Sequence, residues 1–291
     1  MPYDYYARRG ESAYASFEAV PVTGALGAYI KGIDITQPLD EATAEELRDA
    51  LVTHMVLFFR DQPLTPPQHV RFAKIFGEVQ MGGTIPRLEE QPEIKKQEYT
   101  AQSQVTGDVN MHADDTFVEI PSRCSILHGV KMPKVGGDTL WVNCEAAYYA
   151  LSEPMKKMLE PLKAVHDLSA NFGNIAPGVE SPEMKIRIHK NYPPVEHPVI
   201  RTHPVSGRKC IYVNEMVTSR IVGLEPAESK VILKFLIDHL KNPVFHVRLH
   251  WEDNTVVVWD NRATQHVVMA DFQPSYRLNQ RIAIKDDARP V

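Results

Sequence analysis

The chain has 291 residues, of which 43% are hydrophobic and 24% charged, so it has the composition and length of a globular protein with a sizeable core. A net charge of −5 argues against a nucleic-acid partner, and the longest apolar runs, such as 55–59, are too short to cross a membrane. Three widely spaced cysteines and a polar N-terminus without a signal sequence predict a reducing compartment, and we expect a cytoplasmic protein.

The first half of the chain predicts mixed short elements after a polar, aromatic arm over residues 1–15; residues 16–291 are expected to form one domain. These elements are short strands over 24–35, a helix over 40–54 capped by Asp40, a buried strand over 55–59, a helix over 66–76 with proline in its first turn, and an irregular segment over 80–110. Loops of the length of that last segment are usually functional or mobile.

The second half predicts strands more clearly. Its elements are β-rich pieces over 117–143, helical segments over 145–162, a loop over 168–200, a helix over 226–242 with the apolar stripe Ile232, Phe235, Leu236 and His239, and strands over 245–251, 255–260 and 276–284. Many short strands with few helices indicate a mainly β sandwich-like or barrel-like core with helices outside. The chain lacks GxGxxG, GxxxxGK[ST] and GxSxG, which removes the main support for nucleotide-binding α/β folds and serine hydrolases.

A polar segment, NMHADDTF (110–117), is the first candidate for a functional site. In an extended chain His112 and Asp114 point to the same side and can offer two ligands to one cation, with His266 as the best third ligand. Two histidines and one carboxylate form the facial triad of non-haem Fe(II) enzymes, which leaves coordination positions open. A bare HxD is common by chance, so a polar loop remains the alternative at this point.

The strand over 276–284 adds a second signal, because Arg277, Asn279 and Arg281 alternate on one face and Leu278, Ile282 and Ile284 on the other. Buried guanidinium groups need anionic partners. If this face lines a cavity, each arginine can bind a carboxylate or sulfonate through two hydrogen bonds. A solvated edge strand is the alternative.

Together these residues resemble the taurine/2-oxoglutarate dioxygenase family, which includes taurine and aryloxyalkanoate dioxygenases. The resemblance covers most of the chain and rests on segments in the family's order: GALGAYIKGIDI (24–35), HADDTF (112–117), GGDTLWVN (136–143), HPVIRTHPVSGRKCIYVNE (197–215), WDNRATQH (259–266) and RLNQRIAI (277–284). It implies a double-stranded β-helix, a distorted jelly roll with outer helices. It also implies an Fe(II)- and 2-oxoglutarate-dependent dioxygenase that forms a homodimer or homotetramer.

The resemblance also implies residue roles. His112, Asp114 and His266 would hold iron, and Arg277 and Thr139 would bind 2-oxoglutarate. Arg281 and Phe172 fall where taurine-type enzymes bind the substrate's anionic group and place an aromatic wall. Asp260 and Asn261 are expected to brace the strand end near His266. The expected cofactors are Fe(II), 2-oxoglutarate and O2, with ascorbate as an added reductant.

Three features of the sequence depart from the taurine enzymes. Gln80 and Gly82 stand where a histidine is expected, Asp108 replaces an asparagine and would repel a sulfonate, and Met111 replaces a tryptophan. The sequence therefore predicts intact oxygenase machinery with an altered substrate pocket. The expected reaction is oxidation, most simply hydroxylation, of a C–H bond in a small anionic organic molecule, with release of succinate and CO2.

Several alternatives stay open on the sequence. The chain could be a taurine or alkyl sulfonate dioxygenase proper, or a relative that desaturates or rearranges its substrate. From other classes, a zinc hydrolase would leave Arg277 without a role, and a non-catalytic binding protein would not need an intact triad.

Overall fold

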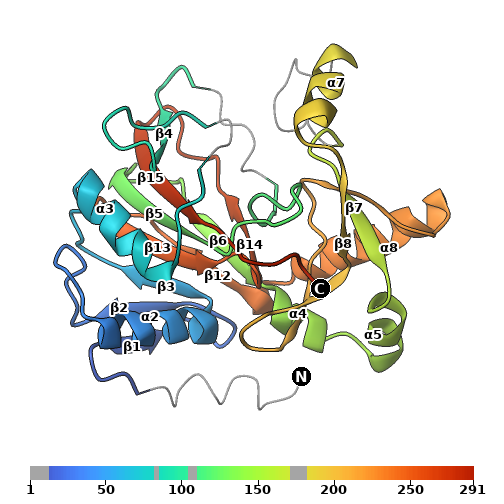
Figure 1. Ribbon diagram of the computed structural model, residues 1–291, viewed down its shortest axis with the longest axis horizontal. Coiled ribbons are helices and arrows are strands. Elements are labelled where there is room, and N and C mark those ends of the chain that lie inside the picture. The colour runs from blue at the N-terminus through green and yellow to red at the C-terminus, as the bar shows by residue number, and fades with distance from the viewer. Residues whose placement is uncertain (1–12, 82–84, 104–109, 171–181) are drawn as a thin grey trace.

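The computed structural model describes residues 13–81, 85–103, 110–170 and 182–291. Strands form its centre and helices pack outside them, as the sequence predicts (Figure 1). No helix of the described chain is long and apolar enough to span a membrane.

The largest sheet has seven strands, and its centre is β13, whose residues are all buried. All pairs in it are antiparallel except β2–β3. In spatial order the strands are β1 (Glu18–Pro21), β2 (Ala28–Lys31), β3 (Val56–Phe59), β13 (Thr255–Asp260), β5 (Cys124–Lys131), β15 (Arg277–Ile284) and β4 (Lys95–Tyr99).

A three-stranded antiparallel sheet supplies the other half of the central core, in the order β12 (His246–Leu249), β6 (Thr139–Asn143) and β14 (Thr264–Val268). The chain passes repeatedly between this sheet and the large one, as from β12 to β13 to β14. Two small sheets lie beyond it: β11 (Thr218–Ile221), β7 (Lys163–His166) and β8 (Val195–Pro198), and the pair β10 (Lys209–Ile211) and β9 (Ile200–Thr202).

Two helices and a short 3-10 turn cover the large sheet: α2 (Glu41–His54), α3 (Pro66–Ala73) and η1 (Lys74–Phe76). Asp40 caps α2, since its Oδ1 accepts a hydrogen bond from the Thr43 amide at 2.8 Å. Leu47, Ala50 and Leu51 bury the inner face of α2. Thr65 begins α3 with a capping box, and proline follows at the first helical turn.

The remaining helices lie on the opposite side of the molecule, to the right in Figure 1: α4 (Cys144–Tyr149), α5 (Glu153–Leu159), α7 (Pro182–Asn191), α8 (Pro226–Leu240) and the 3-10 turn η2 (Pro243–Phe245). The helical segments expected over 145–162 are α4 and α5; Ser152 is extended and precedes α5 as its N-cap, with Pro154 in the first turn. The loop expected over 168–200 contains α7 and β8, and the irregular segment over 80–110 contains β4.

The stripe predicted for α8 is partly wrong. The helix buries Ser229, Leu233, Leu236 and Leu240, whereas Phe235 is 42% exposed. The predicted set lay one residue around the helix from the true one, because α8 has apolar residues on more than half of its circumference and pattern alone does not identify the packed face.

The chain's three tryptophans, Trp141, Trp251 and Trp259, lie between the two central sheets. Each is about 1% exposed, and the ring of Trp141 is 6.0 Å from that of Trp259. The three rings form an apolar surface between the two sheets, which we call the tryptophan floor. It lies at the end of the sheets where the polar side chains of the candidate site meet.

Candidate active site

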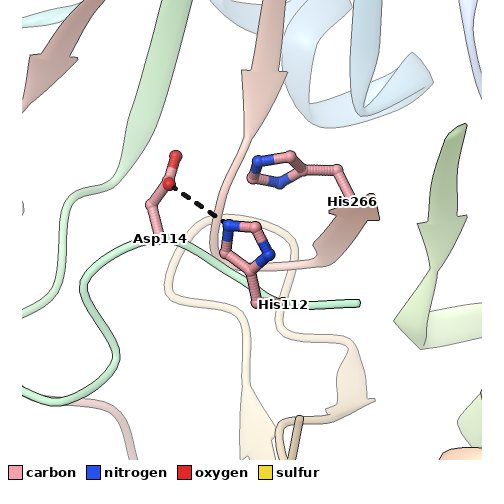
Figure 2. Close-up of side chains that lie close together, drawn as sticks. All are labelled: His112, Asp114 and His266. Atoms are coloured by element: carbon pink, nitrogen blue, oxygen red, sulfur yellow. Dashed lines mark ion pairs between the residues drawn. The ribbon is translucent and has the colours of Figure 1, made fainter. Parts of the chain in front are cut away.

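Three candidate metal ligands meet beside the middle of β14. His112 and His266 form an isolated β-bridge: the His112 amide donates to the His266 carbonyl at 3.0 Å and the reverse bond is 2.7 Å. Directly paired residues point to the same face, so their rings lie 4.4 Å apart. With Asp114, they offer ligand atoms that all lie within 4.8 Å of one another, and all three are buried (Figure 2).

Asp114 is held through its backbone by Asn261. The Asp114 amide donates to Asn261 Oδ1 at 2.7 Å, and Asn261 Nδ2 donates to the Asp114 carbonyl at 2.9 Å. The carboxylate itself accepts hydrogen bonds from Ser125 Oγ at 3.0 Å and Arg281 Nη1 at 2.8 Å. These contacts fix the rotamer that turns the carboxylate toward the histidines.

Each histidine ring can present a nitrogen to one cation. His112 Nδ1 is 2.7 Å from the Asn110 carbonyl, which can only accept, so Nδ1 carries a proton and Nε2 is the nitrogen that faces Asp114 Oδ1, at 3.9 Å. Burial, with His112 adding to it, lowers the pKa of His266 to about 3, so the ring is neutral at physiological pH.

Asp114 is the charged member of the set. Burial alone would raise the pKa of its carboxyl, but Arg281 and the two histidines outweigh burial and hold that pKa well below its ordinary value. Two imidazoles and one carboxylate are the donor set of a non-haem Fe(II) site, and His266 Nδ1 is buried with no hydrogen-bond partner in the described chain. The residues present therefore fit Fe(II).

A narrow cavity adjoins the triad. Its walls combine polar strand residues with the tryptophan floor: Gln97, Leu127, Thr139, Trp141, Trp251, Trp259, His266, Val268, Arg277, Asn279 and Arg281. Arg277, Asn279 and Arg281 share the buried face of β15, with 2%, 1% and 6% exposure. Because β4 pairs along the outer side of β15, the solvated-edge alternative is wrong and the arginines line a cavity.

Arg277 and Thr139 both line this cavity. Trp251 Nε1 donates to Thr139 Oγ1 at 2.9 Å, so the threonine oxygen is already an acceptor and its own proton is left to donate. The Arg277 guanidinium lies 5.3 Å from the centre of the Phe272 ring. A fixed cation and a hydroxyl donor are suited to one carboxylate.

Arg281, expected to bind the substrate's anionic group, forms a buried ion pair with the metal-facing carboxylate of Asp114. It lines the cavity as well, so it contacts the metal-ligand cluster and the cavity at once. The spacing of β15 placed it on the correct face. The pairing with Asp114, 167 residues away, depends on tertiary packing.

Of the other expected substrate contacts, the structure describes only Gln80. Gly82, Asp108 and Phe172 lie outside the described residues. The Gln80 amide donates to the Ala283 carbonyl at 2.8 Å, and Gln80 is not among the described residues that line the cavity.

Asp260 does not touch the ligands. Its carboxylate accepts hydrogen bonds from His203 Nε2 at 2.9 Å and from Arg262 Nε and Nη2 at 2.9 and 2.8 Å. These contacts anchor the end of β13 immediately before Asn261, so Asp260 acts on the site only through its neighbour in the chain.

Sequence reasoning missed the contribution of β4. Lys95, Gln97 and Tyr99 pair directly with Arg281, Asn279 and Arg277, and Gln97 lines the cavity. The segment KKQEY has no hydrophobic alternation, which is the usual sign of a strand. No local signal in this polar segment marks it as a strand, because its pairing with β15 joins distant parts of the chain.

The comparisons with known proteins agree with this site. Residues 18–283 match the model of the family described as taurine catabolism dioxygenase TauD, TfdA family. An alkylsulfatase of Acinetobacter baylyi is 35% identical over 269 residues, which cover 90% of this chain and 83% of that protein. An alpha-ketoglutarate-dependent sulfate ester dioxygenase of Pseudomonas putida is also 35% identical over 269 residues, covering 91% of this chain and 88% of that protein.

Solved structures show the same relationship. The crystal structure of a taurine dioxygenase from Burkholderia xenovorans superposes with a TM-score of 0.82 at 33% identity, covering 95% of this chain and 91% of that one. The chain belongs to the TauD/TfdA family. It is a 2-oxoglutarate-dependent non-haem iron dioxygenase that uses Fe(II), 2-oxoglutarate and O2 and acts on small molecules.

Proposed function

We propose that this dioxygenase oxidises the carbon that bears the ester oxygen in a small organic sulfate. The observation that carries the proposal is the buried polar wall of the cavity, where Arg281 lies beside the metal-ligand cluster and an anionic group can reach it. Two relatives at 35% identity, named as an alkylsulfatase and a sulfate ester dioxygenase, support a sulfate as that anionic group.

In this proposal His112, Asp114 and His266 hold Fe(II). When bound with 2-oxoglutarate and O2, the iron supplies oxidation of a C–H bond, and 2-oxoglutarate leaves as succinate and CO2. Arg277 and the Thr139 hydroxyl hold the distal carboxylate of 2-oxoglutarate. The tryptophan floor keeps water out of this end of the cavity, which strengthens both contacts.

The chemistry after oxidation needs no further residue. A hydroxyl placed on the carbon that carries the sulfate gives a hemiacetal ester. Its C–O bond to the sulfate breaks as the new hydroxyl forms a carbonyl and loses its proton. The products are an aldehyde and inorganic sulfate, so the protein would act as a sulfatase without a hydrolytic nucleophile.

Two other readings have specific weaknesses. A taurine dioxygenase would be expected to have a histidine near Gln80, and this chain has none there. A zinc hydrolase would give Arg277 and Thr139 no ligand. Gln80, Gly82 and Phe172 are kept as proposed substrate contacts, and so is Asp108, on the organic part of the substrate, because its carboxylate would repel the sulfate.

The test is succinate formation from 2-oxoglutarate under air with Fe(II) and ascorbate. The panel holds alkyl sulfates, alkyl sulfonates, taurine, aryloxyalkanoates and a control without substrate, with His112→Ala as the blank. We expect alkyl sulfates to raise succinate most, with sulfate released in equal amount. A larger response to another class would reassign the substrate, and equal signals from wild type and blank would refute the metal assignment.

The finer structural expectations also remain proposals. We propose that residues 16–291 form one domain in which the two central sheets make a double-stranded β-helix, preceded by an arm over 1–15. We propose that it works in the cytoplasm as a homodimer or homotetramer. An experimental structure and light scattering of the purified protein would test the fold and the assembly.

A further inference from the structure

A buried lysine lies beside the metal-ligand cluster, on the strand that sequence reasoning missed. Lys95 on β4 pairs with Arg281 on β15, and the two strands run side by side (Figure 1). Side chains of directly paired residues lie on the same face of a sheet. Arg281, Gln97 and Asn279 line the cavity, and Lys95, which is not itself among the lining residues, lies next to Arg281 on the same face of the sheet.

The Lys95 ammonium is poorly compensated. Lys95 is 4% exposed, and it makes no ion pair or side-chain hydrogen bond to any described residue. Burial lowers its pKa and Arg281 lowers it further, while Asp115 and Asp114 act in the opposite direction. Asp115 Oδ2 is itself buried without a hydrogen-bond partner in the described chain. Burying a cation in this way is costly unless an anion is brought to it.

Arg281 alone would be a weak receptor for an anion. Its guanidinium is already bound to the Asp114 carboxylate, which offsets much of its positive potential. A second cation on the same face would restore that potential. Lys95 is the cationic residue that pairs directly with Arg281, so its side chain shares the same face of the sheet.

The charge balance of this end of the protein points to one kind of ligand. Four cationic side chains, Arg277, Arg281, Lys95 and Arg87, which pairs with Lys95 across an isolated β-bridge, are accompanied by the carboxylates of Asp114 and Asp115. The charges of Fe(II) and dianionic 2-oxoglutarate cancel. The loaded site therefore keeps a net positive charge, which an organic anion offsets and a zwitterion does not.

We infer that Lys95 binds the substrate's anionic group together with Arg281, and that the two cations select singly charged anions over zwitterions such as taurine. This inference rests on the proposed function, because it requires an organic anion as substrate. It adds the residue that confers the selection.

The experiment measures binding without turnover. Protein loaded with Mn(II) and N-oxalylglycine, an unreactive analogue of 2-oxoglutarate, is titrated calorimetrically with hexyl sulfate, hexanesulfonate, taurine and 1-hexanol. The variants are Lys95→Met, which keeps length and removes charge, and Lys95→Arg, which keeps charge. The matched control is Lys96→Met: Lys96 is the next residue on β4, on its other face, with a side chain 37% exposed and paired with Glu98 at 2.5 Å.

We expect Lys95→Met to weaken hexyl sulfate and hexanesulfonate binding roughly tenfold to hundredfold, the loss of one charged hydrogen bond. Taurine, 1-hexanol and N-oxalylglycine should bind as they do to wild type. Lys95→Arg should recover most of the loss, and Lys96→Met should behave as wild type. Thermal unfolding of each loaded protein checks the fold; if Lys95→Met unfolds, Lys95→Gln takes its place in the comparison with Lys95→Arg.

Two failures are distinguishable. If wild type binds hexyl sulfate and Lys95→Met binds it equally well, Lys95 is only a counter-ion of Asp115, and the inference is overturned while the proposed function stands. If wild type binds none of the organic anions, the proposed function fails and the role of Lys95 fails with it.

Discussion

Two buried clusters of histidine and aspartate adjoin the peptide bond between Asp260 and Asn261. They differ in whether their polar atoms hydrogen-bond to one another. Asp260 accepts hydrogen bonds from His203 and Arg262, and His203 Nδ1 in turn accepts from the amides of Val205 and Ser206. In the other cluster, beginning at Asn261, the ligand atoms of His112, Asp114 and His266 converge, and the contact between His112 Nε2 and Asp114 Oδ1 is a long one of 3.9 Å.

The comparison teaches how to tell a structural polar cluster from a ligand site. Every strong donor near Asp260 has its acceptor within the protein, so the cluster is complete and anchors a strand end. In the His112 cluster, Asn110 and Asn261 hold His112 and Asp114 in place, and the Asp114 carboxylate accepts hydrogen bonds from Ser125 and Arg281. We call the Asp260 cluster closed, because its donors and acceptors bond to one another, and the His112 cluster open, because its ligand atoms converge without hydrogen bonds between them. This difference marks the metal site more specifically than residue type does.

The largest expected effect comes from breaking the open cluster. His112→Ala should reduce succinate formation to background and remove Mn(II) binding measured by calorimetry, because two protein ligands hold the metal too weakly. Without metal, its unfolding temperature should stay near that of wild type, since Ala keeps the backbone bridge to His266 and the Asn110 carbonyl loses a single donor, His112 Nδ1. A large loss of stability would mean that the cluster is structural.

Breaking the closed cluster should do the reverse. Asp260→Asn leaves the Arg262 guanidinium buried without its counter-ion, which typically costs about 3–5 kcal/mol of unfolding free energy. Urea unfolding followed by tryptophan fluorescence measures this cost. Any protein that folds should still bind Mn(II) through an intact triad; a selective loss of metal with unchanged stability would contradict the assignment.

Asn261→Ala separates the two clusters, because Asn261 directly follows Asp260 in the chain but hydrogen-bonds to the backbone of Asp114 in the other cluster. We expect metal affinity to fall about tenfold to hundredfold, the usual effect of removing a residue that orients a ligand. Competition of Mn(II) between the protein and a fluorescent chelator gives that affinity. Asn261→Asp is the useful partner variant: it keeps the acceptor for the Asp114 amide and loses the donor to its carbonyl.

The smallest effect concerns core histidines that belong to neither cluster. Burial, with His128 adding to it, lowers the pKa of His69 to about 3, and burial lowers that of His166 to about 3 as well. The unfolded chain therefore binds more protons between the ordinary histidine pKa near 6.5 and about 3. Each histidine should cost about 1.4 kcal/mol of stability per pH unit as the pH falls through this window.

Urea unfolding at pH 7.0, 6.0 and 5.0 tests this. Replacing His69 by Gln should flatten the slope below pH 6.5 by one histidine's share. Stability that does not fall between pH 6 and 5 would mean that these rings are protonated in the folded protein.

Local pattern was enough for the elements with strong periodicity or clear caps. Asp40 caps α2 as predicted, Val247, Leu249 and Trp251 are buried as the alternation over 245–251 indicates, and β15 presents Arg277 and Arg281 on one face. It failed where the local signal was weak. The strand β4 has no apolar alternation, and the apolar circumference of α8 hid which face packs.

The sequence by itself determined the class of this protein. The HxD pair, the third histidine and the arginines of one alternating strand are chemical identities at fixed spacing, and spacing of two residues along a strand is local geometry. Tertiary structure alone decided which polar groups meet. The pairing of His112 with His266, the hold of Asn261 on Asp114 and the position of Lys95 opposite Arg281 join residues about 150 to 190 positions apart. Strand register creates such contacts, and no local propensity encodes register between distant strands.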